Sequence, residues 1–240
     1  MESNQLNHSA FKTNAITAAA LVLLACAPAA QAQLIDGGYE VGPLTTIANV
    51  LGNPYPAYLG QWGHESSTIT GAVGGVVPFA GSSQMLSMTA TGGVTTQTVQ
   101  AVDVTSYGGF TSGGNFTLDA QFNAAQPGTV GGLAMQFFSG NTYGTQIGTF
   151  VSNSFSLDAN PNTWQQFGIG GAIPSGTNWM LAQVFYTNAS LANAVGTFGA
   201  GYVDAAGMTV AVPEPGTWAT LGAGLAVLGA MARRRKLAVQ

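Results

Sequence analysis

Short segments of alternating apolar and polar residues, separated by glycine, asparagine and proline, run through the middle of this chain. The clearest is residues 116–122, Phe-Thr-Leu-Asp-Ala-Gln-Phe, in which every second side chain is apolar. Side chains of a β-strand point alternately to two faces, so this pattern predicts a strand with one buried face. The same reasoning predicts strands at residues 84–90, 95–104, 133–138, 154–157, 164–169, 180–186 and 202–210.

These segments predict an all-β fold. Gly-Gly pairs at 92–93, 113–114 and 131–132 fall between them, and no heptad, internal repeat or long helical period is visible. About eight strands of this length predict an antiparallel β-sandwich, and a jelly roll is the version we expect. The predicted domain covers residues 33–211, which is long enough to bury a sizeable core.

The first residues, 1–32, predict a signal peptide. An apolar stretch follows Lys12, and Ala30 and Ala32 supply the small-x-small pattern of a cleavage site. We expect cleavage after Ala32, export, and a mature chain without disulfides, because Cys26 is the only cysteine. An alternative is a lipoprotein signal, in which Cys26 ends an approximate lipobox and becomes the acylated first residue.

The last residues, 212–240, have three parts: a motif, an uncharged apolar run over 217–232, and a basic end. The motif is Val212, Pro213, Glu214 and Pro215, and the basic end is Arg233, Arg234, Arg235 and Lys236. A helix over the apolar run would be roughly 24 Å long, short for a bilayer core of about 30 Å unless Trp218 and the arginines extend it at the interfaces. The cations after the run favour a cytoplasmic C-terminus. The two prolines cannot extend a helix, so the motif is predicted to be accessible at the membrane surface.

This three-part tail resembles the PEP-CTERM sorting signal of Gram-negative bacteria, which a membrane-embedded exosortase recognises. The resemblance implies anchoring in the inner membrane by a C-terminal transmembrane helix, cleavage near the motif, and then a place at the cell surface or outside the cell. Signal peptidase and the exosortase machinery are the implied partners. A permanent membrane anchor is the alternative, since it shares every feature except the Pro-Glu-Pro. Such tails are sometimes named after ice-binding proteins, but that name implies no ice binding by the body.

The charges of the chain are divided between its ends and its middle. Lys12 and the basic end account for every lysine and arginine. The body therefore has no basic side chain to pair its acids, which are Asp36, Glu40, Glu65, Asp103, Asp119, Asp158 and Asp204. An acidic surface without cations excludes nucleic acid as a partner, because nothing neutralises the phosphates.

Several short motifs of the body resemble exported carbohydrate-binding modules of the galactose-binding-like jelly-roll group. They are residues 34–42, Trp62, and residues 164–167, 173–177 and 202–210. In such modules an acid of the first strand and one of the last bind a structural calcium ion, so the resemblance implies Glu40 and Asp204 as calcium ligands. The other interpretation is that Glu40 caps a turn and Asp204 accepts backbone N–H bonds. No other cofactor is predicted.

The aromatic residues divide into two groups. Tyr55, Tyr58, Trp62 and Tyr107 lie in segments rich in glycine and proline, so they are candidates for flat platforms under sugar rings. A structural role is the alternative for each of them. Trp164, Trp179 and Tyr186 lie in or beside predicted strands, and we expect these three in the core.

No catalytic residues are predicted. His64 is the only histidine outside the signal peptide, and no Ser-His-Asp set, metal-ligand cluster or phosphate loop can be assembled. We therefore expect an exported, non-catalytic protein of the cell surface or the extracellular matrix, associated with biofilm exopolysaccharide. The alternative is a carbohydrate-binding module that recognises exopolysaccharide through the loop aromatics.

Overall fold

The structure, a computed structural model of the chain, has two compact units. Ala30–Val212 form one unit, and Met1–Ala29 with Pro213–Gln240 form the other. The residues described are 34–41, 44–46, 61–64, 67–89, 95–105, 110, 113–140, 145–188, 201–211, 222–226 and 228. Among them, every β-strand belongs to the first unit.

In the second unit, residues 222–226 and 228 are helical and lie inside the apolar run predicted to be a helix. No helix within the described residues is both long and apolar enough to cross a membrane. The signal peptide and most of the predicted 217–232 helix lie outside the described residues, so both remain predictions.

The first unit is built from eleven strands in the described residues. They are β1 (Thr45–Thr46), β2 (Gly63–His64), β3 (Ser67–Thr70), β4 (Met85–Met88), β5 (Thr95–Asp103), β6 (Gly114–Ala124), β7 (Thr129–Phe138), β8 (Gln146–Ser156), β9 (Gln165–Ile173), β10 (Trp179–Asn188) and β11 (Gly201–Ala211).

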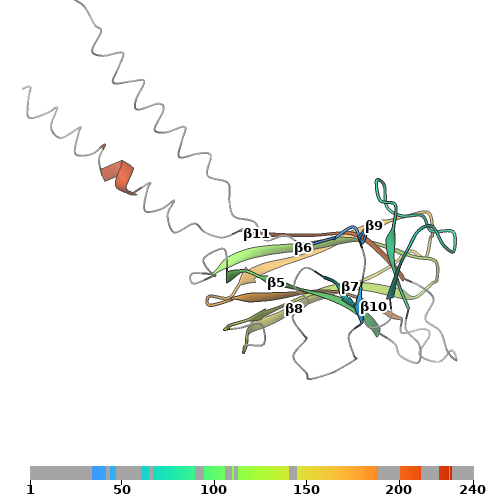
Figure 1. The fold of residues 1–240 in the computed structure, drawn as a ribbon, viewed down its shortest axis with the longest axis horizontal. Helices are drawn as coiled ribbons and strands as arrows, with labels where there is room; N and C mark the ends of the chain where they lie inside the picture. The colour runs from blue at the N-terminus through green and yellow to red at the C-terminus, as the bar shows by residue number, and fades with distance from the viewer. Residues whose placement is uncertain are drawn as a thin grey trace, which may run out of the picture. The chain divides into compact units, whose positions relative to one another are not determined.

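These strands form two sheets packed face to face (Figure 1). The six-stranded sheet has the order β1-β2-β5-β10-β7-β8, and the five-stranded sheet has the order β3-β4-β11-β6-β9. All pairs are antiparallel except β1 with β2. The predicted all-β antiparallel sandwich is therefore confirmed, and from β4 onward the chain changes sheet at almost every connection, as a jelly roll requires.

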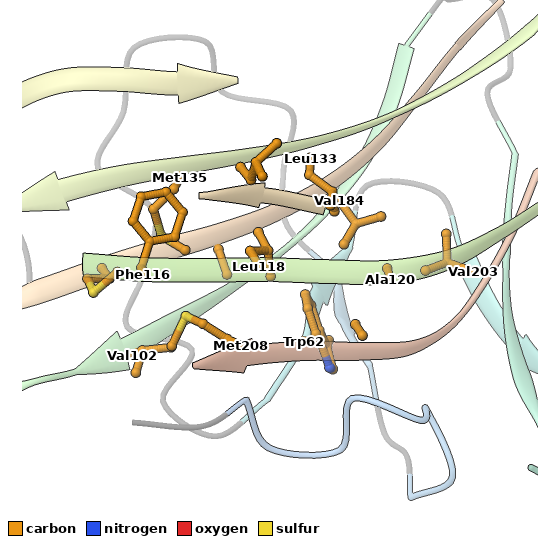
Figure 2. Close-up of a cluster of buried hydrophobic side chains, with 14 of the residues drawn as sticks. Trp62, Val102, Phe116, Leu118, Ala120, Leu133, Met135, Val184, Val203 and Met208 are labelled. Carbon is orange, nitrogen blue, oxygen red and sulfur yellow. The ribbon is translucent and has the colours of Figure 1, made fainter. Parts of the chain in front are cut away.

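The core lies between the inner faces of the two sheets. On β6 the apolar residues of the alternating sequence are the ones that point into the core. Phe116, Leu118, Ala120 and Phe122 are all buried. They pack against inward side chains of the other sheet, such as Leu133, Met135 and Val184, which Figure 2 places together. Full burial of a side chain of this size stabilises the fold by about 1.5–3 kcal/mol. Alternating residues on the two sheets thus supply one continuous core.

One predicted boundary between strands was wrong. The pair Gly131 and Gly132 does not separate strands but lies inside β7. A Cβ at Gly131 would meet the ring of Phe122 at 2.7 Å, and one at Gly132 would meet the ring of Phe185 at 2.1 Å. These glycines therefore make room for aromatic rings on both faces of the sheet.

Candidate functional site

The segment 34–41 bonds to β5 through Gln100 and is held by an irregularity in β11. The register between β11 and β6 shifts between Asp204 and Gly207, which marks a β-bulge, and Ala205 has a φ of 47°. Within the bulge the N–H of Ala206 donates to the carbonyl of Gly37 at 2.8 Å. The bulge thus joins the first described segment of the body to its last strand.

The carboxylate of Asp204, on the bulge, is buried and accepts three hydrogen bonds. The N–H of Phe79 donates to Oδ2 at 2.8 Å, and the hydroxyl of Ser82 and the N–H of Ala205 donate to Oδ1 at 3.1 and 2.6 Å. Burial raises the pKa of Asp204, although these donors act in the opposite direction. Asp204 therefore joins β11 to the turn at residues 79–84.

Glu40, in the segment 34–41, holds the other end of the same turn. Its Oε1 accepts from the N–H groups of Ser83 and Gln84 at 2.8 and 3.2 Å, and its Oε2 accepts from the Ser83 hydroxyl at 2.5 Å. The Ser83 hydroxyl bond, followed by the Gln84 N–H, lowers the pKa of Glu40. The two acids singled out in the sequence therefore meet on one turn, which we call the carboxylate-anchored turn, residues 79–84.

The donors around these acids bear on the predicted calcium site. Both carboxylates of Glu40 and Asp204 already accept N–H and O–H bonds from the carboxylate-anchored turn. Calcium prefers six to eight oxygen ligands, and no group of three or more His, Cys, Asp or Glu side chains that could hold a metal occurs in the described part of the chain. One buried oxygen nearby, the hydroxyl of Tyr39, has no hydrogen-bond partner there. The hydrogen bonds match the anchoring interpretation, and calcium binding is the alternative that a melting experiment can decide.

Trp62 does not lie on the surface as a platform for a ligand. Its side chain is only 2% exposed, its ring centroid lies 5.2 Å from that of Tyr39, and its Nε1 donates to the carbonyl of Asp36 at 3.0 Å. Figure 2 shows it among the core side chains beside Met208. Trp62 sits in a loop-like sequence but is buried because the segment 34–41 covers it. The other predicted platform residues, Tyr55, Tyr58 and Tyr107, lie outside the described residues.

Of the three aromatic residues expected in the core, two are buried and Trp164 is only half-buried. Tyr186 is fully buried in the main core and donates its hydroxyl to the carbonyl of Tyr202 at 2.6 Å. Trp179 is also buried. Trp164, by contrast, packs against a smaller cluster formed by Val76, Met85 and Tyr202 and donates to the carbonyl of Val77 at 3.0 Å. Trp164 thus stabilises the segment that leads into the carboxylate-anchored turn.

An exposed group of polar side chains lies on the outer face of the five-stranded sheet. The hydroxyls of Thr117 and Thr209 are 2.6 Å apart, and Gln166 Nε2 donates to Asp119 Oδ2 at 3.0 Å. Gly168 and Gly207 flank Asp119 and have no side chain to cover it. We call Thr117, Asp119, Gln166 and Thr209 the polar patch. The alternation of residues 116–122 places Thr117 and Asp119 on one face, but no sequence signal indicates the neighbours from β9 and β11.

His64, the remaining histidine, has a structural contact. Its Nδ1 accepts from the N–H of Ser67 at 2.9 Å, which requires an unprotonated Nδ1. Burial lowers the pKa of His64 below its ordinary value. The folded state therefore prefers the neutral imidazole.

This preference predicts a loss of stability in mild acid. The unfolded chain takes up a proton near pH 6.5, whereas the folded chain resists it. The stability that neutral His64 contributes to the fold is complete above the unfolded-state pKa. It declines as the pH falls from that value through the lower folded-state pKa. We expect the free energy of unfolding, measured with urea between about pH 5.5 and 8, to decrease toward acid. A His64→Asn variant, which keeps an acceptor but does not titrate, should have a flatter profile; an equally steep profile would contradict the assignment.

The molecule described so far is a β-sandwich with a carboxylate-anchored turn and an exposed polar patch. The C-terminal segment defines it further, because residues 211–236 match the PEP-CTERM protein-sorting motif. The chain therefore carries a PEP-CTERM sorting motif directly after β11, which implies export and anchoring through the tail before processing. The predicted signal-cleavage residues Ala30 and Ala32 lie outside the described residues. The same holds for the motif at residues 212–215 and the basic end at residues 233–236.

Solved structures similar to this chain include carbohydrate-binding modules and a phage enzyme. The C-terminal family 22 carbohydrate-binding module of Clostridium thermocellum Xyn10B is 16% identical over 63% of this chain and 86% of its own, with a TM-score of 0.43. The CBM22-2 xylan-binding domain of Paenibacillus barcinonensis Xyn10C is 13% identical over 75% and 98%, with a TM-score of 0.42.

The enzymatically active domain of tailspike protein 4 from bacteriophage CBA120 is 14% identical, with a TM-score of 0.43. The similarity covers 66% of this chain but only 21% of the tailspike chain. No curated protein matches the chain. The ligand of this chain has to be inferred from its own residues.

Proposed function

We propose that this chain is an exported, non-catalytic protein of the cell surface or extracellular matrix, placed there through its PEP-CTERM motif. The match of residues 211–236 to that motif is the observation that supports the proposal. The apolar run and the basic end hold the precursor in the inner membrane, and exosortase cleaves near Pro213-Glu214-Pro215. The β-sandwich then becomes a component of the envelope or of a biofilm matrix rich in exopolysaccharide.

The intact mass of the protein from envelope and medium tests this proposal, in cells with and without their exosortase. We expect a chain that begins at Gln33 and ends near the Pro-Glu-Pro motif only when the enzyme is present. A mass that retains Arg233 to Lys236 in both strains would instead establish a permanent membrane anchor. A chain that begins with an acylated Cys26 would establish the lipoprotein signal.

A second function, binding of exopolysaccharide by the sandwich, is favoured by the polar patch. Hydroxyl, amide and carboxylate groups there have the chemistry that bonds sugar hydroxyls. Asp119 is oriented by Gln166, and its glycine neighbours leave the carboxylate approachable. Tyr55, Tyr58 and Tyr107 are proposed to supply the apolar platforms.

Binding to the cell's own exopolysaccharide tests this second function. We expect Asp119→Ala to weaken binding about tenfold, because a hydrogen bond to a charged group contributes about 1.5–3 kcal/mol. Asp103→Ala removes a carboxylate from the other sheet and serves as the matched control. Normal binding by Asp119→Ala together with loss in Tyr58→Ala would assign recognition to the aromatic loop instead. Absence of binding by the unaltered protein would leave the matrix role as the one remaining proposal.

The calcium prediction has a direct thermal test. Because the carboxylate-anchored turn already supplies donors to Glu40 and Asp204, we expect the melting temperature of the protein to be the same in chelator and in excess calcium. A melting temperature that calcium raises in the unaltered protein but not in Asp204→Asn would contradict this expectation. Such a result would establish the two acids as ligands of a structural calcium ion.

A further inference from the structure

The two sides of the sandwich end in strands of very different length. On one side the outer strands β1 and β2 have two residues each and β3 has four. On the other side lie β8, with eleven residues, and β9, with nine, joined by stacking of Phe155 on Phe167 at 4.1 Å. Short outer strands are a common protection against pairing with another chain. Only one side of this sandwich has that protection.

Strand β8 is the more exposed of the two long edges. In the described strands it pairs with β7 alone, and it contains no charged residue and no proline, the other common protections of an edge. The register shift near Gly148 disturbs its first part, but Val151–Ser156 pair regularly with residues 130–135 of β7. Along these residues no strand of the described part of the chain lies beside the backbone groups that point away from β7. One of the exposed N–H groups, that of Ser154, donates to the adjacent Asn153 side chain at 2.9 Å.

We propose that β8 pairs with β8 of a second copy of this chain, antiparallel and about a two-fold axis at Asn153. In this register Val151 lies opposite Phe155, Ser152 opposite Ser154, and Asn153 opposite its own copy. Pairs of β-branched with aromatic residues and pairs of hydroxyls stabilise antiparallel strands. The six-stranded sheets of the two copies then continue into each other.

The charges show where a second copy can approach. The body holds only acids, so two bodies repel wherever acidic surfaces meet. The β8 edge is the place where they can approach, because residues 146–156 are uncharged. Asp158, just after the strand, lies opposite Gly148 of the other copy in this register. No acid therefore faces another acid across the paired strands.

Sedimentation equilibrium of residues 30–212, a compact unit with its own core, tests the pairing. We expect reversible dimers in the unaltered protein. Asn153→Lys should raise the dissociation constant at least about fivefold, because it places two cations opposite each other on the two-fold axis. Asn115→Lys makes the same change at an exposed position of β6, an inner strand of the other sheet, and should leave the dissociation constant unchanged.

A mixing experiment separates edge pairing from other causes. Asn153→Asp alone should also weaken dimers, whereas an equimolar mixture of Asn153→Lys and Asn153→Asp should restore them through opposite charges. A monomeric unaltered protein, equal weakening by Asn115→Lys, or failure of the mixture to pair would each overturn the proposal. Melting temperatures of the variants verify that each is folded.

Discussion

Asp204→Ala is expected to lower the free energy of unfolding by about 3 kcal/mol, because hydrogen bonds to a buried carboxylate contribute strongly and their loss leaves N–H groups unpaired. The N–H groups of Phe79 and Ala205 and the hydroxyl of Ser82 lose their acceptor together. The carboxylate-anchored turn then keeps its bonds to Glu40 but loses those to β11. Urea denaturation of the body measures the loss.

Asp103→Ala is the matched control for that change. Among the described residues, the donors to Asp103 are the N–H and hydroxyl of Thr105, two residues away and exposed, so we expect a loss below about 1 kcal/mol. Asp204→Asn should give an intermediate loss, because it keeps one acceptor oxygen. Equal losses from Asp204→Ala and Asp103→Ala would show that Asp204 does not anchor the turn.

Gly37→Ala is expected to destabilise the fold by about 2–4 kcal/mol, as severe overpacking does. A Cβ at Gly37 would lie 1.9 Å from the carbonyl oxygen of Ala206, which is backbone and cannot turn aside as a side chain can. The segment 34–41 must therefore move off the bulge, with loss of the bond from the Ala206 N–H and exposure of Trp62. We expect a lower melting temperature and a red-shifted tryptophan emission.

The adjacent Gly38→Ala provides the control, since its Cβ would meet nothing closer than the flexible Glu40 side chain at 3.5 Å. We expect its melting temperature to stay close to that of the unaltered protein. If Gly37→Ala and Gly38→Ala have the same melting temperature, the segment 34–41 does not lie on the bulge as described.

Strands with one buried face could be predicted from the sequence, because alternation is a local property of the chain. β6 is the best example, and β5, β10 and β11 were placed within about two residues. β8 could not be predicted at its full length, and only residues 154–157 were indicated. Most of its side chains are exposed on both faces, so its hydrogen bonds to β7 define it and no hydrophobic pattern does.

The candidate site could be predicted only in part. The resemblance singled out Glu40 and Asp204 together as calcium ligands; both contact one turn, and they do so as acceptors of N–H and O–H bonds. Their partners Phe79, Ser82 and Ser83 could not be inferred, since a loop brings them there from a distant part of the chain. Trp62 was misplaced for a related reason, because its burial depends on the segment 34–41 covering it.

The position of β11 has a mechanical consequence for an anchored protein. β11 lies inside the five-stranded sheet, pairs with β6 over residues 201–204 and 207–211, and ends where the sorting motif begins. Any part of a pull on the tail that acts along β11 loads the perpendicular hydrogen bonds to β6 in shear, so that they share the force. A tail attached to an edge strand could instead peel that strand away one bond at a time. While the precursor is tethered to the membrane, its attachment point is thus an inner strand with a partner on each side.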